Sequence, residues 1–507
     1  MSNKEIRVRF APSPTGGLHI GGVRTLLYNY LFAKKNKGKL ILRIEDTDQT
    51  RFVFNAEEYI YDCLKWCNIE ADEGVIQGGD YGPYKQSERK EIYLPYALDL
   101  VEKGHAYYAF DTVEELAEMR EKFKTKENPS PQYDANTRMQ MKNSLTLGIE
   151  ESIKKIKAGE DYVIRALIPQ NETVVFEDAV RGTIHHDTNT LDDKVLIKTD
   201  GMPTYHMAVV VDDYLMKISH IMRGEEWLPS TPLHVLLWKQ LGWEADLPTF
   251  AHLPLILKPD GNGKLSKRDG DRLGFPVFAM DWKDANSGEI VKGFKEMGFL
   301  PEAFLNLLAF LGWSSGEERE IYSMKEMTEL FSLDRIHKGG AKFDYEKAKW
   351  FNEQHIKNMT AQELLPFVKK FYPIADTIKE NDLLWVIDTV KERCQLLTEF
   401  WEQSFFFFED PESLDMDSLK KGWNEEKELF FKTWIEEIKK QDLNNADSWK
   451  DSFENLIKEK AIKKGAVMMP LRVMLVGGKF GPGIFDITSF IGKEKTIKRI
   501  ENALAAL

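Results

Sequence analysis

A glycine-rich stretch near the start of the chain, RFAPSPTGGLHIGGVRT over residues 9–25, has the composition of a phosphate- or nucleotide-binding turn. A glycine turn that leads into a helix presents free backbone N–H groups and the positive end of the helix dipole, which suits phosphate. The glycines that would let a phosphate or a flat base touch the main chain are Gly16, Gly17, Gly21 and Gly22. His19 can donate a hydrogen bond to a phosphate oxygen. A glycine loop by itself is more often only a tight strand-to-helix turn.

A second basic segment lies far downstream, in KPDGNGKLSKRDG over residues 258–270. Lys264, Lys267 and Arg268 surround Ser266 between glycines. A flexible loop of this kind could close over a triphosphate, whereas a charge run considered alone is more often a solvated surface. Together the two stretches favour a site for a nucleoside triphosphate.

The elements around the first stretch predict the opening of a doubly wound parallel α/β sheet. Residues 4–12 (KEIRVRFAP) predict a strand, and residues 39–48 (KLILRIEDTD) predict a second strand that ends in acidic residues. Between them, one helical stripe ends before Gly38. Its members are Val23, Leu26, Leu27, Tyr30 and Leu31. Strand, glycine loop, helix and strand in this order are typical of the doubly wound folds.

The rest of the chain divides into three further regions. From about residue 104 to 200, alternating runs such as DYVIRALIP and TVVFEDAVRGTIHH predict a smaller, mostly antiparallel insertion. Residues 203–227 predict a return to strands and glycine turns, the second half of the split sheet. After Asn358 the periodicity is helical almost throughout, which predicts stacked helices.

Composition excludes several classes of protein. A chain of 507 residues is long enough for two to four domains with separate cores. Its three cysteines, Cys63, Cys67 and Cys394, are too few for a disulfide framework and lack the spacing of a structural zinc site. The net charge of −13 argues against a general nucleic-acid coat, although a local basic face can still hold a polyanion. The absence of a long apolar run or a signal peptide predicts a cytoplasmic protein that does not use a membrane.

The motifs in order along the chain resemble those of class I aminoacyl-tRNA synthetases. The two stretches correspond to the histidine–isoleucine–glycine–histidine loop and the mobile lysine–serine–lysine loop of that superfamily. Four segments are similar in sequence to glutamyl-tRNA synthetases of the bacterial type. They are RFAPSPTGGLHIGG, LRIEDTD, TDGMPTYHMAVVVDDYLMKISHIMRGEEW and KLSKR. The resemblance covers essentially the whole chain, including PLRVMLVGGKFGPGIF near its end.

The resemblance implies the fold class and the division into domains. It implies a Rossmann-type α/β catalytic domain with an inserted α+β acceptor-binding domain, followed by all-α anticodon-binding domains. The predicted bounds are residues 1–104 and 205–262 for the two catalytic halves, 105–204 for the insertion, 263–357 for a mobile-loop and stem-contact domain, and 358–507 for the helical anticodon-binding region.

The implied activity is the two-step attachment of L-glutamate to tRNA(Glu). The α-carboxylate of glutamate attacks the α-phosphorus of ATP, and a ribose hydroxyl of the terminal adenosine then takes the acyl group. Phosphoryl chemistry needs positioning and charge neutralisation, which His19, Lys264 and Lys267 would supply with Mg²⁺. By resemblance the ATP-binding residues are His19, Gly21, Gly22, Glu226, Leu265, Ser266 and Lys267. Gly22 stands where the superfamily motif has its second histidine, so the role falls to His19 alone.

Glutamate has two carboxylates and one ammonium group, so its site needs cations and an anion. Arg9 and Arg223 can each pair with a carboxylate through two hydrogen bonds, and Glu45 can hold the ammonium group. The resemblance adds Ala11 and Ser13 as lining residues and the hydroxyl of Tyr205 as a donor. We predict that Arg9 reads the side-chain carboxylate, with Arg223 as the alternative.

The tRNA contacts are expected outside the catalytic sheet. By resemblance, Arg393 contacts the third anticodon base, which favours an enzyme restricted to tRNA(Glu). The alternative is a surface arginine paired with Glu392 or Glu399. The sequence YYAFDT stands where the zinc-binding variant of the family needs cysteines, so no zinc is predicted. The FFFF run at 405–408 favours buried packing over base stacking.

Other functions fit the sequence less well. Other nucleotidyl transferases share the glycine loop but not a long helical C-terminal region, and a shorter tRNA-modifying relative ends before any anticodon domain. Glutaminyl-tRNA synthetases have a different sequence around the amino-acid pocket and usually a β-barrel anticodon-binding region. A catalytically inactive tRNA-binding paralogue would tolerate the loss of His19, Glu45 or Lys267, and all three are present. A monomer is predicted; charging of tRNA(Gln) and a tRNA requirement for activation stay open.

Overall fold

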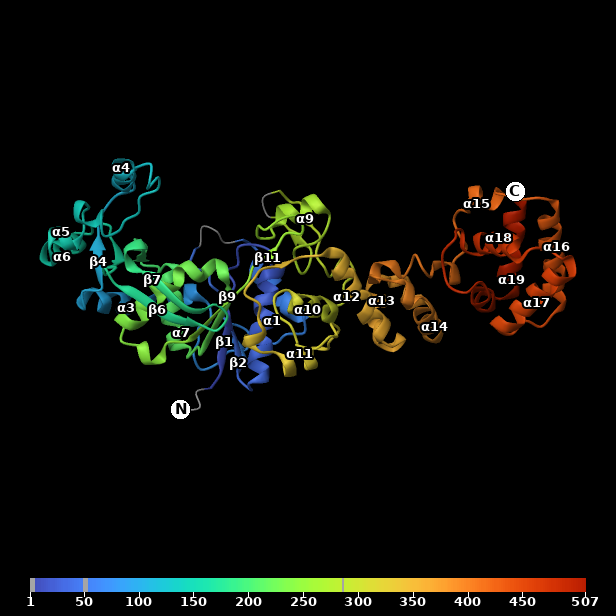
Figure 1. The fold of residues 1–507 in the computed structure, drawn as a ribbon, viewed down its shortest axis with the longest axis horizontal. Helices are drawn as coiled ribbons and strands as arrows, with labels where there is room; N and C mark the ends of the chain where they lie inside the picture. The colour runs from blue at the N-terminus through green and yellow to red at the C-terminus, as the bar shows by residue number, and fades with distance from the viewer. Residues whose placement is uncertain (1–4, 49–52, 285–286) are drawn as a thin grey trace. The chain divides into compact units, whose positions relative to one another are not determined.

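The computed structural model describes residues 5–48, 53–284 and 287–507, which divide into two compact units (Figure 1). The first unit comprises the chain up to Glu296 together with Pro301–Tyr345. The second comprises Met297–Leu300 and Glu346–Leu507.

Parallel strands form the centre of the first unit. One sheet has the order β1 (Arg7–Phe10), β2 (Lys39–Leu42), β3 (Glu73–Gly74), and the other has the order β7 (Gly182–Asp187), β6 (Thr173–Asp178), β10 (Thr249–Leu253), β9 (His220–Gly224). All pairs are parallel except the β6–β7 hairpin. The two sheets adjoin where the Ser219 N–H donates to the Arg7 carbonyl at 2.8 Å. The expected doubly wound α/β fold is confirmed.

The first unit also contains helices. Among them are α1 (Ile20–Lys35), α2 (Ala56–Trp66), α3 (Lys90–Glu102), α7 (Tyr205–Leu215), α8 (Thr231–Gln240), α9 (Lys267–Leu273), α10 (Pro301–Phe310) and α11 (Met324–Leu330). Of these, α1 packs on β1, β2 and β9, and α8 packs on β6. Four of the five residues predicted for the stripe of the first helix, Val23, Leu26, Leu27 and Leu31, are fully buried in α1, whereas Tyr30 is only half-buried. Cys63 and Cys67 lie on and after α2 as buried free thiols, as predicted for an apolar helix face.

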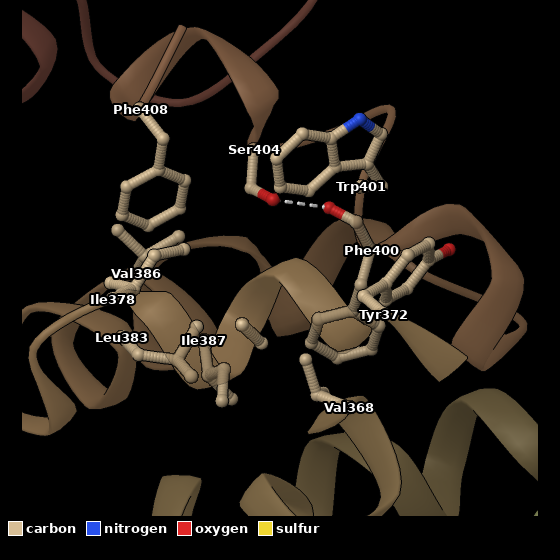
Figure 2. Close-up of a pocket in the computed structure, with 11 residues that line it drawn as sticks. Val368, Tyr372, Ile378, Leu383, Val386, Ile387, Phe400, Trp401, Ser404 and Phe408 are labelled. Carbon is tan, nitrogen blue, oxygen red and sulfur yellow. Dashed lines mark hydrogen bonds between the residues drawn. The ribbon is translucent and has the colours of Figure 1, made fainter. Parts of the chain in front are cut away.

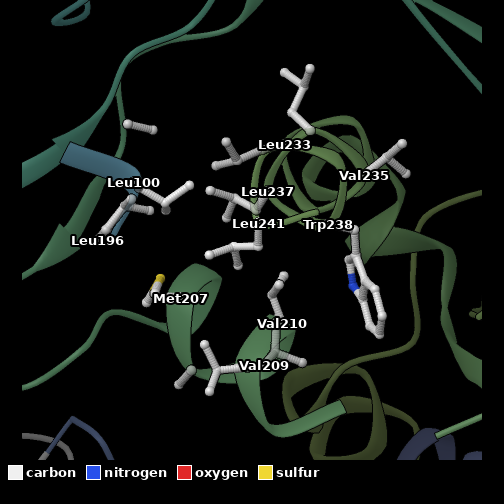
Figure 3. Packing of buried hydrophobic residues seen from close by; sticks show 14 of the residues in the cluster. Leu100, Leu196, Met207, Val209, Val210, Leu233, Val235, Leu237, Trp238 and Leu241 are labelled. Atoms are coloured by element: carbon white, nitrogen blue, oxygen red, sulfur yellow. The ribbon is translucent and has the colours of Figure 1, made fainter. Parts of the chain in front are cut away.

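The strand prediction for residues 203–227 is wrong over its first half. Tyr205–Leu215 form the helix α7, and only His220–Gly224 form a strand, β9. Figure 3 shows Val209 and Val210 of α7 in one apolar cluster with Leu237 and Trp238 of α8. A short apolar run that is buried on most sides lacks the periodicity that would separate a helix from a strand.

The insertion contains an antiparallel sheet, as predicted. Its strands have the order β4 (Ala106–Ala109), β5 (Val163–Ala166), β8 (Val195–Ile197), and its helices are α4 (Val113–Phe123), α5 (Ser144–Leu147) and α6 (Ile149–Lys157). The β6–β7 hairpin, which lies in the same stretch of sequence, instead pairs with β10 in the catalytic sheet. Short strand pairs complete the unit: β11 (Ile256–Leu257) with β14 (Ala341–Lys342), and β12 (Trp282–Lys283) with β13 (Ile290–Val291).

The second unit is helical, as the periodicity after Asn358 predicts. Its helices are α12 (Tyr345–Asn358), α13 (Ala361–Phe371), α14 (Glu380–Val390), α15 (Met416–Lys420), α16 (Glu425–Lys440), α17 (Ala446–Lys460), α18 (Lys464–Val476) and α19 (Ile484–Ala505). Figure 2 shows Phe408 and Trp401 at a small apolar pocket beside α14. Phe406 and Phe407 are buried, which confirms the packing interpretation of the FFFF run.

Among the described residues, no helix combines the length and the apolar character that crossing a bilayer requires.

A buried ion pair holds the edge of the first sheet. Both terminal nitrogens of Arg7 donate to Glu73, at 2.7 and 2.9 Å, and the Tyr84 hydroxyl donates to the same carboxylate at 2.6 Å. The Lys39 ammonium lies 3.2 Å from it. The hydrogen bond from Arg7 is the largest of the effects that lower the pKa of Glu73 to about 2.

Because of the Arg7–Glu73 pair, we expect the free energy of unfolding to fall at acid pH. The pKa of Glu73 is about 2 in the fold and about 4.5 when unfolded, so its contribution is complete above pH 4.5 and is lost as the pH falls from 4.5 to 2. The full contribution is about 3 kcal/mol. Glu73→Gln should lower the free energy of unfolding by about 3–5 kcal/mol near pH 7, because Arg7 stays buried without its partner.

The difference in the free energy of unfolding between Glu73→Gln and the wild type should be about 2 kcal/mol smaller near pH 3 than near pH 7. At pH 3 the wild-type carboxyl group is largely protonated in the unfolded state. Urea unfolding followed by tryptophan fluorescence at both pH values measures this. The matched control is Glu5→Gln, whose carboxylate lies 3.6 Å from Arg7 but is 51% exposed. The same difference in the free energy of unfolding between Glu73→Gln and the wild type at pH 3 and at pH 7 would contradict the prediction.

Candidate active site

The glycine-rich stretch places His19 at the start of α1, where its ring is held as a hydrogen-bond donor. His19 is the N-cap residue, and its Nδ1 accepts from the Gly21 N–H at 3.2 Å. Since Nδ1 accepts, the proton of the neutral ring is on Nε2. That Nε2 is buried and has no partner among the described residues. Burial first, and then Lys264, lower the pKa of His19 to about 4, so the ring is neutral near pH 7.

The glycines of this stretch serve different purposes. A Cβ on Gly17 would lie 2.9 Å from the Trp282 ring, so this glycine is required by packing. A Cβ on Gly21 would meet only the His19 ring, at 3.6 Å. On Gly22 it would meet the flexible Leu18 side chain. Gly21 and Gly22 therefore lie in the first turn of α1, where close approach of a ligand to the backbone is sterically open.

The second basic segment reaches this region through Lys264. Its ammonium donates to the Glu226 carboxylate at 2.5 Å. Burial alone would raise the pKa of Glu226, but Lys264 lowers it below its usual range. The Leu265 backbone N–H is taken by the Ile256 carbonyl at 2.8 Å. Lys264 and Glu226 both act electrostatically on His19, so these three predicted residues are brought together.

Lys267 lies in a different setting from Lys264. It is the first residue of α9, and Ser266 is the N-cap, with the Asp269 carboxylate accepting from the Ser266 N–H at 3.1 Å and from its hydroxyl at 2.6 Å. The Lys267 ammonium lies 3.8 Å from the Asp284 carboxylate. No contact between Lys267 and His19 is found within the described residues.

Arg9 ends in a pair of terminal nitrogens that are available to a ligand. The residue is buried at the end of β1, and its Nε donates to the two oxygens of Asp213 at 3.1 and 3.4 Å. Its two terminal nitrogens have no partner in the part of the chain that the structure describes. A guanidinium in this state can bind a carboxylate through two parallel hydrogen bonds.

A completely buried arginine, Arg43, supports this arrangement. It donates to Glu45 at 2.8 Å through Nη2 and to Asp213 at 2.8 Å through Nη1, and these two carboxylates hold its pKa well above the ordinary value. Burial raises the pKa of Glu45, and Arg43 opposes that shift. Only one oxygen of Glu45 is engaged by partners in residues 5–48, 53–284 and 287–507. The other oxygen is free to accept from a cationic ligand group.

Arg223 is held more fully than Arg9. Its Nη1 donates to the Tyr205 hydroxyl at 2.8 Å, its Nη2 to the Thr231 hydroxyl at 2.8 Å, and its Nε to His252 at 3.1 Å. A weaker contact joins Nη2 to the Trp227 carbonyl at 3.4 Å. One N–H of Nη1 is left without a partner among the described residues, enough for a single hydrogen bond to a ligand.

Tyr205 connects the two halves of this cluster. Burial raises its pKa, and Arg223, Glu45 and Arg9 all act on it electrostatically. The four predicted residues therefore lie together at the carboxyl ends of β1, β2 and β9 and the start of α7, where ligands bind in open α/β sheets. Ala11 and Ser13 lie between β1 and α1, in a segment that the Glu45 N–H joins through the Pro12 carbonyl at 3.0 Å.

Sequence reasoning missed Arg43, Asp213, Thr231 and His252. A signal was present for two of them. Arg43 interrupts the apolar run LILRI, and Asp213 belongs to a pair of acids that follows AVVV. Charged residues inside apolar runs are rarely buried unless they are paired, so each of them indicates a buried partner. The hydroxyl and the imidazole have no comparable signal.

Arg393 lies in the second unit, in the single 3₁₀ turn Lys391–Arg393 that follows α14. The residue is exposed, and no ion pair of it is found in the described residues. The Glu399 carboxylate, one of its two alternative partners, instead accepts from the Gln395 N–H at 2.7 Å. Arg472 lies close enough for Arg393 to lower its pKa, after burial. Two neighbouring cations favour contact with an anion.

Comparison with known families identifies two regions of the chain. A family model described as tRNA synthetases class I (E and Q), catalytic domain, matches residues 5–350. A second, described as an anticodon binding domain, matches residues 359–504.

Known relatives match over their full length. A glutamate–tRNA ligase from Amoebophilus asiaticus is 50% identical over 504 residues, which covers 99% of this chain and 98% of the relative. One from Christiangramia forsetii is 51% identical over 511 residues, which covers 100% of both chains. Among solved structures, a glutamate tRNA ligase from Elizabethkingia meningosepticum in complex with its amino acid has a TM-score of 0.94 and 47% identity, covering 99% of this chain and 100% of that one. The enzyme from Elizabethkingia anophelis has a TM-score of 0.91.

The geometry at His19 predicts a histidine that does not titrate near neutrality. With its pKa at about 4, the ring should stay neutral, with the proton on Nε2, between about pH 5 and pH 8. Nitrogen-15 NMR of ring-labelled histidines measures the tautomer, and the spectrum of His19→Gln identifies the resonance. A ring that titrates near its ordinary value of 6.5, or one protonated on Nδ1, would contradict the arrangement.

Proposed function

This chain belongs to the glutamate–tRNA ligases of the class I tRNA synthetase family, and we propose that it joins L-glutamate to tRNA(Glu) in two steps. Glutamate and ATP give glutamyl-adenylate and pyrophosphate, and the glutamyl group is then transferred to the terminal adenosine of the tRNA with release of AMP. The fold that the sequence predicts, a class I catalytic domain followed by an anticodon-binding region, is confirmed by the two matched domains.

The observation that carries the proposal is the set of unfilled hydrogen-bonding positions at the glutamate site. Among the described residues, Arg9 has two terminal nitrogens without a partner, Glu45 has one such oxygen, and Arg223 has one such N–H. Arg9, Arg43 and Arg223 face Glu45 and Asp213, while Asp212, 3.9 Å from the Arg43 Nε, is balanced by Arg89 at 2.7 Å. Together these side chains therefore carry one net positive charge, which a ligand with one net negative charge balances. Glutamate carries that charge, with two carboxylates and one ammonium group.

We base the assignment of the two glutamate carboxylates on the difference in free N–H groups between Arg9 and Arg223. A bidentate clamp suits the side-chain carboxylate, which does not react, so Arg9 reads it. The α-carboxylate must keep an oxygen free to attack phosphorus, so the single N–H of Arg223, next to the Tyr205 hydroxyl, suits that group. Glu45 holds the ammonium group, and Ala11 and Ser13 line the pocket.

The ATP side uses the start of α1 and the downstream basic segment. The buried Nε2–H of His19 has no partner among the described residues and can donate to a phosphate oxygen. Lys264 exchanges its bond with Glu226 for the phosphates, and Lys267 neutralises charge that develops there. The remaining ATP contacts assigned by resemblance are Gly21, Gly22, Glu226, Leu265 and Ser266.

The finer features follow the same reasoning. Mg²⁺ enters with ATP and neutralises part of its phosphate charge, and among the described residues no group of three or more metal-ligating side chains forms a separate site. We propose that the chain uses no zinc, works as a monomer and acts in the cytoplasm, where its tRNA substrate is found. Its three cysteines are free thiols, which suits a reducing compartment.

For the tRNA, we propose that the insertion at residues 105–204 grips the acceptor stem and that Arg393 reads the third anticodon base. An exposed guanidinium without an ion pair in the described residues is available for this contact. A catalytically inactive tRNA-binding paralogue is not favoured by any observation, since His19, Glu45 and Lys267 are all present.

Charging with each amino acid tests the proposal and the role of Arg9. The wild-type protein should charge tRNA(Glu) with glutamate and prefer it over glutamine by about 10²- to 10³-fold or more in kcat/KM. Glutamine would leave a buried guanidinium without its partner, which costs about 3–5 kcal/mol, and about 1.4 kcal/mol corresponds to tenfold. Arg9→Gln should remove most of this preference.

The matched control is Arg319→Gln, an arginine whose side chain is 50% exposed and paired with Glu317. Its amino-acid preference should be unchanged. Absence of glutamate charging by the wild type would exclude the proposed function, and full retention of the preference by Arg9→Gln would move the side-chain carboxylate to Arg223.

Arg393→Gln should change the choice of tRNA. The third anticodon base is cytosine in tRNA(Glu) and guanine in tRNA(Gln), and a contact that specifies a base contributes roughly 1–3 kcal/mol. The ratio of charging efficiencies for tRNA(Glu) over tRNA(Gln) should fall by about tenfold, while pyrophosphate exchange at saturating tRNA changes little.

A suitable control is Lys432→Gln on α16, an exposed cation of the same unit that pairs with Glu428 at 2.6 Å. It should leave the ratio unchanged. An equal loss on both tRNAs would mean that Arg393 contacts only the phosphate backbone, and no loss would mean that it is a surface arginine without a role.

A further inference from the structure

The turn of the β6–β7 hairpin contains a buried carboxylate, Asp178, which the proposed mechanism does not use. It is 3% exposed and accepts from the Val180 and Arg181 N–H groups at 2.9 and 2.8 Å, through Oδ1. Its Oδ2 lies 2.6 Å from Nδ1 of His252 and also accepts from the His252 backbone N–H at 3.1 Å. The hairpin is thereby fastened to β10, next to the glutamate site.

This carboxylate determines which nitrogen of His252 carries the proton. Burial would raise the pKa of Asp178, but hydrogen bonding from His252 lowers it, so the group is ionised and can only accept. The imidazole is completely buried, and burial lowers its pKa. A neutral ring that donates from Nδ1 to Asp178 leaves Nε2 as an acceptor.

The acceptor nitrogen faces Arg223. Nε2 of His252 lies 3.1 Å from the Arg223 Nε and 3.1 Å from the Thr231 hydroxyl. The guanidinium plane is thus held by His252 at Nε, by Tyr205 at Nη1 and by Thr231 at Nη2. With the opposite tautomer, the Nε2–H would point at the Arg223 N–H. Two facing donors in a buried site repel, and the guanidinium would have to turn.

We propose that Asp178 and His252 are positioning residues that orient Arg223 toward the α-carboxylate of glutamate. Asp178 sets the tautomer of His252, and His252 in turn sets the plane of the guanidinium. The inference rests on the proposed function, since it assigns Arg223 to the amino acid.

A second contact of the same turn supports this role. Arg181 bonds to the Glu225 carboxylate and donates to the Lys338 carbonyl at 2.7 Å. Glu225 also accepts from the Leu255 N–H at 2.9 Å. The hairpin turn therefore holds the segment from Arg223 to Glu225 at both ends, once through His252 and once through Arg181.

The variant Asp178→Asn tests the tautomer directly. The amide oxygen can still accept from the turn N–H groups and from the His252 backbone N–H, which already lies 3.3 Å from Oδ1. The NH₂ takes the place of Oδ2, donates to His252 Nδ1 and moves the ring proton to Nε2. The KM for glutamate should rise by roughly 10- to 100-fold, the effect of losing one hydrogen bond of a charged group, while the KM for ATP and the melting temperature change little. The matched control is Asp187→Asn at the other end of β7, an exposed carboxylate that accepts from the Asn189 N–H at 2.9 Å.

A second variant, His252→Gln, keeps Asp178. The glutamine amide can donate its NH₂ to the Asp178 carboxylate and present its oxygen to Arg223, so it should raise the KM for glutamate less than Asp178→Asn does. An unchanged KM in Asp178→Asn would overturn the proposal. So would an equal rise of the KM for glutamate and the KM for ATP, with a lower melting temperature, in both Asp178→Asn and His252→Gln, because that pattern describes a purely structural pair.

Nitrogen-15 NMR of His252 separates this proposal from the proposed function. A shift of the ring proton from Nδ1 to Nε2 in Asp178→Asn, with the raised KM for glutamate, supports the positioning role. A wild type that does not charge glutamate would refute the proposed function, whatever the tautomer. A ring that keeps its Nδ1 proton in Asp178→Asn would overturn the positioning role alone, in a wild type that charges glutamate normally.

Discussion

The guanidinium of Arg43 is completely buried, and the arrangement of the amino-acid site depends on its neutralisation. Removing a guanidinium from water costs several kcal/mol unless anions surround it at close range. Glu45 and Asp213 meet that need, each at 2.8 Å. Because Asp213 also accepts from Arg9, the same constraint positions a second arginine. β1, β2 and α7 are thus joined by charges as well as by apolar packing.

Glu45 and Asp213 neutralise Arg43, but several neighbouring groups still lack hydrogen-bond partners, and these groups form the ligand site. The terminal nitrogens of Arg9, one oxygen of Glu45 and one N–H of Arg223 lack partners among the described residues. Their burial gives each of them a strong preference for an oppositely charged ligand group, because the interactions take place at low local dielectric. The pocket therefore has the polarity of a dicarboxylic amino acid before the ligand arrives.

The nucleotide site depends on more exposed groups than the amino-acid site does. Its donors are the His19 ring, the first turn of α1, Lys264 and Lys267, and the ion pair between Lys264 and Glu226 is partly exposed. An exposed pair of this kind contributes little stability, so it can exchange for phosphate at small cost. A rigid amino-acid pocket thus lies beside a nucleotide site that can rearrange. Such a division suits phosphoryl chemistry, which depends on positioning charges around a moving phosphorus.

Much of this architecture was accessible from the sequence because it is encoded locally. The glycine turn, the buried stripe of α1, the basic segment around Ser266 and the helical second unit all depend on residues a few positions apart. Family motifs added Arg9, Glu45, Tyr205 and Arg223, which the structure does bring together. The strand prediction for residues 203–227 was wrong only over residues 205–215, where burial on most sides removed the periodic signal and the chain forms α7, and it was right at β9.

The partners of the functional side chains were decided by tertiary structure. Arg43 and Asp213 are separated by 170 residues, and Asp178 and His252 by 74, so no local pattern relates them. The sequence by itself determined which residue types could bind a nucleotide and an acidic amino acid. Only the folded chain decided which of their hydrogen-bonding positions are already filled and which remain open, because that depends on buried contacts between distant segments.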